Sequence, residues 1–218
     1  MNVAKNENFN FFALLYLNDW YRFDRGFISG LSVSQTREIR RKCLERVAND
    51  YRVARNFKKL NEEADNRLAR ALDALDSFSR PNSGEDVDSA VIGLSEKFCS
   101  YYGTNAVSAA SKFLWMQYQS PVIIFDGRAV QCLSLLKTTN YPTYRKEWLS
   151  RYSEHEPSIL KALTELPLVK KFSLAHRMPD TEFGQLIANK WFQERVFDKF
   201  LWWNAKPAND FDESNELL

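Results

Sequence analysis

Apolar side chains that recur at every third or fourth position constrain the fold of this chain more than any other feature. One such stripe predicts a long helix over residues 34–57, preceded by the capping-box pattern of Ser32 and Gln35. A second stripe runs over residues 64–78. Because only 7 Gly and 7 Pro occur in 218 residues, few positions interrupt such helices. The expected fold class is all-α.

A polar stretch, Ser-Arg-Pro-Asn-Ser-Gly at residues 79–84, ends the second stripe. It predicts a boundary between an N-terminal helical lobe, residues 1–80, and a second helical lobe, residues 86–203, with a flexible polar tail over residues 204–218. Further helices are expected at the following places: residues 87–102, 106–118, 143–153 and 157–166, a helix that begins near Asp126, and a last long helix capped by Asp180.

Charge and cysteine content exclude several classes of protein. Thirty Lys and Arg against 28 Asp and Glu give a formal net charge of +2, so a nucleic-acid role must rest on local basic patches. The three cysteines form no C-x-x-C pair and the two histidines no zinc motif, so we expect neither a disulfide framework nor a metal or other cofactor. No apolar run reaches the roughly 20 residues of a membrane span. We expect a cytoplasmic monomer, associated with the nucleoid if the source is bacterial.

The segment from Gly103 to Arg128 contains the strongest candidates for catalytic residues. A tight turn at residues 103–105 joins two predicted helices, and the second of these places Lys112 beside aromatic neighbours. Burial disfavours an ammonium ion and lowers the pKa of a lysine, which makes its amine a nucleophile. Asp126 ends an apolar extended run at the start of the next helix, where a carboxylate is favoured. The segment therefore predicts an amine and a carboxylate that face one cleft.

The order of these parts resembles the helix-hairpin-helix DNA glycosylases, and most of all the 8-oxoguanine DNA glycosylase-like proteins. The resemblance covers residues 87–131 and implies a two-lobed helical fold that binds double-stranded DNA containing a modified base. It implies that the hairpin grips the DNA backbone, that Asp126 drives cleavage of the bond between base and sugar, and that Lys112 attacks the sugar carbon if the enzyme also has lyase activity. The chain departs from the family pattern in having a single hairpin glycine, and Asn105 where the family lysine lies.

Further residues are expected to contact the substrate. Around the extruded base we expect Gly103, Asn105, Ser111, Trp115 and Arg128. Residues 37–59 are rich in basic side chains, and Arg37, Arg41 and Arg55 are expected to contact DNA phosphates, although a solvated helix face explains the same pattern. Aromatic rings stack on flipped bases, and the tryptophans that could do so, or else pack in the core, are Trp191, Trp202 and Trp203.

Two alternative functions fit the same sequence. The first is a non-catalytic helical module that binds DNA or another protein. The second takes residues 121–125 as a buried strand that leads into a nuclease or nucleotide-binding site, but no other segment has the pattern of a partner strand.

Overall fold

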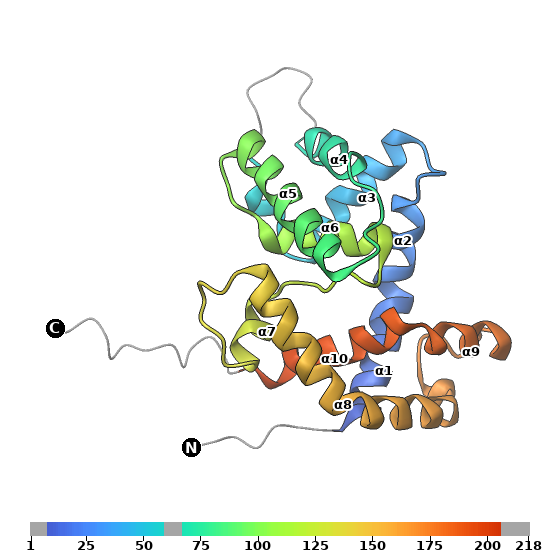
Figure 1. The fold of residues 1–218 in the computed structure, drawn as a ribbon. Coiled ribbons are helices and arrows are strands. Elements are labelled where there is room, and N and C mark those ends of the chain that lie inside the picture. Colours follow the sequence, from blue (N-terminus) through green and yellow to red (C-terminus); the bar gives the residue numbers. More distant parts are fainter. Residues whose placement is uncertain (1–7, 59–66, 206–218) are drawn as a thin grey trace, which may run out of the picture.

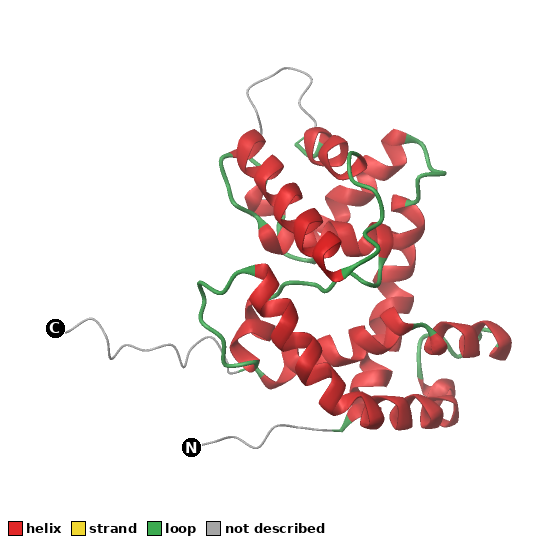
Figure 2. Ribbon diagram, viewed as in Figure 1, coloured by secondary structure: helices red, strands yellow, loops and turns green. Residues whose placement is uncertain are grey.

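The computed structural model describes residues 8–58 and 67–205, and the fold is drawn in Figure 1. Helices make up nearly all of the regular structure, and these residues contain no strand (Figure 2). The all-α prediction is confirmed, and residues 121–125 are extended without a partner strand. The helices have the following bounds: α1 Phe9–Asp19, α2 Arg25–Leu31, α3 Arg37–Asp50, α4 Ala69–Asp76, α5 Gly84–Tyr102, α6 Val107–Tyr118, α7 Gly127–Cys132, α8 Tyr141–Val169, α9 Asp180–Ala188 and α10 Lys190–Asn204.

The helices pack in two groups (Figure 1). One group contains α2 to α6, and the other contains α1 and α7 to α10. A π-helical segment, Trp20–Asp24, continues α1 into α2 and so links the groups. The pocket described below is lined by residues from both groups.

This grouping differs from the predicted division at residues 79–84. Helix α4 precedes that stretch and α5 follows it, yet the two helices pack together, and the Tyr102 hydroxyl of α5 accepts a hydrogen bond from the Ala71 amide. Helix α1 instead packs on α8 and α10, where the Phe9 ring contacts His155 and the Phe12 ring meets Phe200 edge-on. The sequence pattern shows which residues are apolar but not which distant stripe they face.

The first predicted helix has different bounds in the structure. The helix expected over residues 34–57 is α3, which begins after Thr36, whose hydroxyl accepts a hydrogen bond from the Ile39 amide. It ends at Asp50 because Arg52 has a φ of 56°, which breaks the right-handed helix. A 3₁₀ turn, Ala54–Asn56, follows it.

The C-terminal helices also differ from the prediction. Pro157 does not start a helix but lies inside α8, which is continuous over 29 residues. Burial of Tyr152, Ile159 and Leu163 offsets the backbone hydrogen bond that the proline removes. The expected last helix is two helices, α9 and α10, with Asn189 extended between them, and Asp180 is the first residue of α9 rather than its cap.

Three stretches lie outside the described residues, namely 1–7, 59–66 and 206–218, so the start of the second stripe and most of the expected tail belong to them. Of that tail, Asn204 is the last residue of α10. Within the described ranges, no helix is both long and apolar enough to cross a membrane.

Candidate active site

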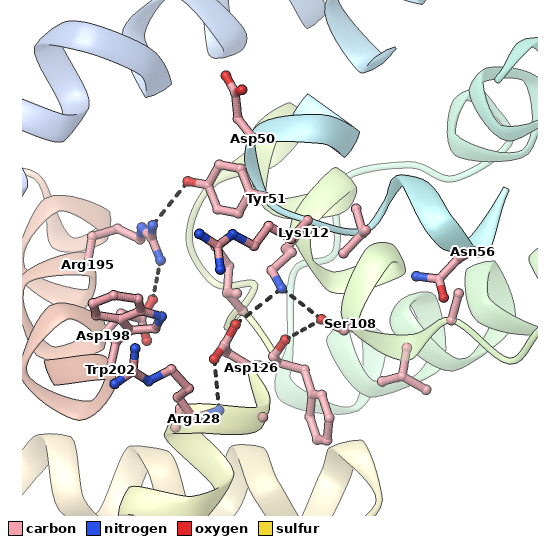
Figure 3. Close-up of a pocket in the computed structure, with 18 of the residues that line it drawn as sticks. Asp50, Tyr51, Asn56, Ser108, Lys112, Asp126, Arg128, Arg195, Asp198 and Trp202 are labelled. Carbon is pink, nitrogen blue, oxygen red and sulfur yellow. Dashed lines mark hydrogen bonds and ion pairs between the residues drawn. The ribbon is translucent and has the colours of Figure 1, made fainter. Parts of the chain in front are cut away.

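A pocket of about 980 Å³ lies where the two groups of helices meet (Figure 3). Its walls come from the π-helical segment, the end of α3 with the turn after it, the start of α6, the extended run into α7, and α10. Lys112 and Asp126 both line this pocket. The predicted convergence of an amine and a carboxylate in one cleft is present in the structure.

Lys112 is held by two acceptors. Its Nζ donates to the Ser108 Oγ at 2.8 Å and to the Asp126 Oδ2 at 3.3 Å (Figure 3). The lysine side chain is 6% exposed, whereas that of Asp126 is 31% exposed. The amine is therefore packed into the wall, and the carboxylate stands at the boundary between wall and pocket.

The start of α7 fixes the Asp126 carboxylate. Asp126 is the N-cap residue of α7, and its Oδ1 accepts a hydrogen bond from the Arg128 amide at 2.9 Å. Such a cap satisfies a helix N–H group and places the negative charge at the positive end of the helix. The second carboxylate oxygen, Oδ2, stays turned towards Lys112.

The extended run before Asp126 is tied down along its backbone. The Ser111 Oγ accepts a hydrogen bond from the Phe125 amide, and the Ser108 Oγ donates to the Phe125 carbonyl. On the other side the hydroxyls of Tyr141 and Tyr144, both on α8, donate to the carbonyls of residues 123 and 124. These bonds keep Asp126 at a fixed place relative to α6 and therefore to Lys112.

Burial lowers the pKa of Lys112, because the ammonium form loses its hydration. The Asp126 carboxylate acts in the opposite direction, and so does Asp198, while Arg195 adds to the lowering. Burial prevails over the nearby carboxylates. The outcome is an amine that loses its proton more readily than an ordinary lysine.

A buried polar network forms the adjoining wall. Arg195 donates to the Asp198 carboxylate at 2.7 Å and to the Tyr51 hydroxyl at 3.1 Å. Tyr51 in turn donates to Asp24 at 2.8 Å, and Trp148 donates to the other Asp198 oxygen at 2.9 Å. The network therefore joins the end of α3 to α10 and to the π-helical segment. Burial raises the pKa of both Asp24 and Asp198.

We expect the Tyr51→Phe variant to lose stability, because it removes the hydroxyl between Arg195 and Asp24. Hydrogen bonds to buried charges contribute about 1.5–3 kcal/mol, and the free energy of unfolding should fall by about that amount in urea titrations. Tyr101→Phe is the control, because Tyr101 is exposed and its ring meets that of its neighbour Tyr102 edge-on, so the change should stay within about 0.5 kcal/mol. Equal stability of the two variants would show that the network does not hold the pocket wall.

Some of the predicted substrate-contacting residues lie at the pocket and others do not. Asn105 and Arg128 line it. Ser111 is fully buried behind the wall and supports Phe125, and Trp115, 1% exposed, packs against the Arg195 guanidinium. Gly103 is exposed at the end of α5 with a φ of 69°, which glycine adopts without strain, and it is not part of the lining.

Of the three arginines predicted to contact DNA phosphates, one lies at the pocket and two lie elsewhere. Arg55 lines the pocket. Arg37 instead forms an ion pair with Asp73 at 2.7 Å, and Arg41 bridges Glu38 and Glu45 on its own helix. Neither lines the pocket, so Arg37 and Arg41 belong to the charge-balanced face of α3.

Among the tryptophans, only Trp202 lines the pocket. Its ring is 43% exposed, and the Arg128 guanidinium carbon lies 3.9 Å from the ring centroid. Trp191 packs against Trp115 in the core, and Trp203 packs against Phe11. Of these three tryptophans, Trp202 is therefore the one placed to contact a ligand in the pocket.

Several pocket residues carried no usable sequence signal. Tyr51 falls within the apolar stripe of residues 34–57, and Asp198 lies three residues after Arg195 on α10, a helix of mixed polar and aromatic side chains. Ser108 lies one helical turn before Lys112, and this spacing could have pointed to it. Arg52 lies in the predicted basic stretch, but its place at the pocket depends on the turn that ends α3.

Metal chemistry has no candidate centre in the described ranges, because no cluster of three His, Cys, Asp or Glu side chains is found there. Comparisons of the chain with protein-family models, curated proteins and solved structures found no match. Function must therefore be inferred from the pocket.

Proposed function

We propose that the protein is a DNA N-glycosylase that extrudes a modified base from a duplex and cleaves its glycosidic bond. The observation that carries this proposal is the Lys112 amine held 3.3 Å from the Asp126 carboxylate at the wall of a deep pocket. The resemblance over residues 87–131 supplies the reaction, and the pocket supplies a cavity for a flipped nucleotide.

Asp126 and Lys112 act in successive steps of the proposed reaction. As the bond between the sugar C1′ and the base breaks, its electrons leave with the base and the sugar becomes cationic. The Asp126 carboxylate stabilises that positive charge. The neutral Lys112 amine then donates its lone pair to C1′, a proton passes from its nitrogen to O4′ as the C1′–O4′ bond opens, and a protonated Schiff base links the enzyme to the sugar. Burial lowers the pKa of Lys112 and so raises the fraction of its amine that is neutral.

The rim of the pocket suits a phosphate backbone. Arg52, Arg55 and Arg128 all line it, and none of them forms an ion pair with another described residue. The first turn of α6 has no side-chain cap, so the amides of residues 107 and 108 can donate hydrogen bonds to a phosphate oxygen at the position that the resemblance assigns to the hairpin. We therefore assign the DNA backbone contacts to this rim rather than to the face of α3.

Charge-reversal variants should show whether the rim or the face of α3 binds DNA. Arg52→Glu with Arg55→Glu should weaken duplex binding at least about tenfold for every sequence, and each lost phosphate contact should reduce the salt slope by about 0.9. Arg37→Glu with Arg41→Glu changes the net charge equally but lies off the pocket, and its effect should be much smaller. Fluorescence anisotropy at several salt concentrations measures both. Equal weakening by the two double variants would mean that net charge, and not the rim, governs binding.

The proposed activity is tested by incubating the protein with duplexes that carry oxidised, alkylated or deaminated bases, followed by alkali to cleave the abasic sites. We expect strand cleavage at one class of lesion. If every duplex stays intact but binds in a salt-dependent manner, the chain is a non-catalytic DNA-binding module.

A further inference from the structure

The Ser108 Oγ forms hydrogen bonds with both the Phe125 carbonyl and the Lys112 amine. We propose that Ser108 is a positioning residue that orients the Lys112 lone pair towards the pocket, an inference that rests on the proposed function. Ser108 lies one turn before Lys112 on α6, and both line the pocket. Their Oγ and Nζ atoms are 2.8 Å apart.

The direction of each hydrogen bond can be assigned by counting protons. A serine hydroxyl has one proton, and Ser108 donates it to the Phe125 carbonyl at 3.0 Å, since a carbonyl oxygen can only accept. Towards Lys112 the Ser108 Oγ must therefore act as an acceptor. The Asp126 Oδ2, as part of a carboxylate, is also an acceptor only. In these two hydrogen bonds Lys112 is therefore the donor, and both of its partners are acceptors.

A neutral amine has two N–H bonds and one lone pair. If one N–H points to Ser108 and the other to Asp126, the lone pair points away from both. Lys112 lines the pocket, and we place the reacting sugar carbon in that remaining direction. The arrangement fixes the nucleophile before the substrate arrives, which lowers the entropic cost of attack.

The same arrangement affects the protonated form. An ammonium ion carries a third N–H, and the described residues offer it no third acceptor. The charged groups that face Lys112 are Asp126 at the start of α7 and Arg195 and Asp198 on α10, next to the Tyr51 hydroxyl at the end of α3. Ser108 is neutral, yet its oxygen favours the ammonium form, because a charged donor makes the stronger hydrogen bond.

The test uses a duplex with a preformed abasic site, whose open sugar presents an aldehyde at C1′. The amine lone pair adds to the carbonyl carbon, a proton passes from nitrogen to oxygen, water leaves, and borohydride reduces the resulting C=N bond. In Ser108→Ala the plateau rate of trapping at high pH should fall about tenfold, because the lone pair is no longer oriented. The midpoint of the pH profile should move to lower pH, because an acceptor that favoured the ammonium ion is gone.

Two variants distinguish a role of Ser108 in orienting Lys112 from a role in supporting the segment at Phe125. Ser108→Thr keeps the hydroxyl and should trap at nearly the wild-type rate. Ser111→Ala removes the other serine bond to Phe125 without touching Lys112, so it loosens the same segment but should leave the pH midpoint unchanged. If Ser108→Ala and Ser111→Ala give the same rates and midpoints, Ser108 only supports the chain and the inference is wrong.

A reaction without DNA makes the inference independent of the glycosylase proposal. Glycolaldehyde with cyanoborohydride labels free amines, and peptide mapping by mass spectrometry can compare Lys112 with the exposed Lys146 in the same sample. On the high-pH plateau, labelling of Lys112 should be slower in Ser108→Ala, with Lys146 unchanged. If this holds while the wild type excises no base, the positioning role stands and the proposed function fails. Equal labelling of Lys112 in the wild type and Ser108→Ala, or none in either, overturns the positioning role.

Discussion

The Asp126→Asn variant is expected to lose base excision by at least about a hundredfold while it keeps its fold. The change removes the charge that stabilises the cationic sugar, and the loss of such a preorganised group costs about 10²–10³ in rate. The fold should persist because Asn is as good an N-cap residue as Asp, and its side-chain oxygen can still accept from the Arg128 amide. Duplex affinity should be unchanged or slightly higher, because a negative charge leaves the pocket.

The same variant should still form a Schiff base with a preformed abasic site, because that step needs the Lys112 amine and not the carboxylate. Asp126 opposes the lowering of the Lys112 pKa, so its loss should move the midpoint of trapping to lower pH. Trapping rises with pH in both proteins, since only the neutral amine attacks. Single-turnover excision and borohydride trapping between about pH 5 and 9 measure the two steps separately. Full excision by Asp126→Asn would remove Asp126 from the mechanism.

The Lys112 and Asp126 pair could be predicted because its geometry is local. Both residues lie within 15 positions, and the short extended run at residues 121–125 brings the start of α7 back against α6. Helix ends also carry recognisable signals, and Asp126 caps α7 as expected. The cap at Asp126 and its closeness to Lys112 therefore follow from local sequence, while the catalytic roles of both residues stay predictions.

The side chains that face the pocket were harder to predict on α6, because this helix is buried on nearly all sides. Residues Ala109 to Met116 are all buried, so burial does not distinguish the side of α6 that lines the pocket from the sides that pack in the core. Of the residues expected to contact the substrate, Ser111 supports Phe125 and Trp115 packs on Arg195. Helical spacing puts Ser108, Ser111 and Lys112 on one face, but it does not say which of them reach the pocket.

Contacts between distant segments could not be expected from spacing at all. Arg195 and Tyr51 are 144 positions apart, yet they form one wall of the pocket. In contrast, Glu38 and Glu45 stand three and four positions from Arg41, so the neutralisation of that arginine could be anticipated from helical spacing. The turn at Arg52 ends α3 and brings Arg52 and Arg55 to the pocket, whereas Arg128 reaches it from α7.

The Lys112→Gln variant should lose covalent trapping completely, because an amide cannot form an imine. If the Lys112 amine attacks C1′, the wild type should be trapped by borohydride on its substrate duplex and the variant should not. Stability should fall little, since the Asp126 carboxylate left without its partner is 31% exposed and can be hydrated. Circular dichroism and thermal unfolding check that the variant is folded.

Lys199 provides the matched control, because it is the other lysine that lines the pocket and its amine is bound to Asp19 at 2.5 Å. Lys199→Gln should be trapped as the wild type is. If Lys112 instead only holds a phosphate or the base, the wild type should excise the base without being trapped, and Lys112→Gln should bind weakly with residual excision. Trapping that persists in Lys112→Gln but disappears in Lys199→Gln would transfer the nucleophile to α10. The reacting sugar carbon would then lie closer to Asp19 and Asp198 than to Asp126.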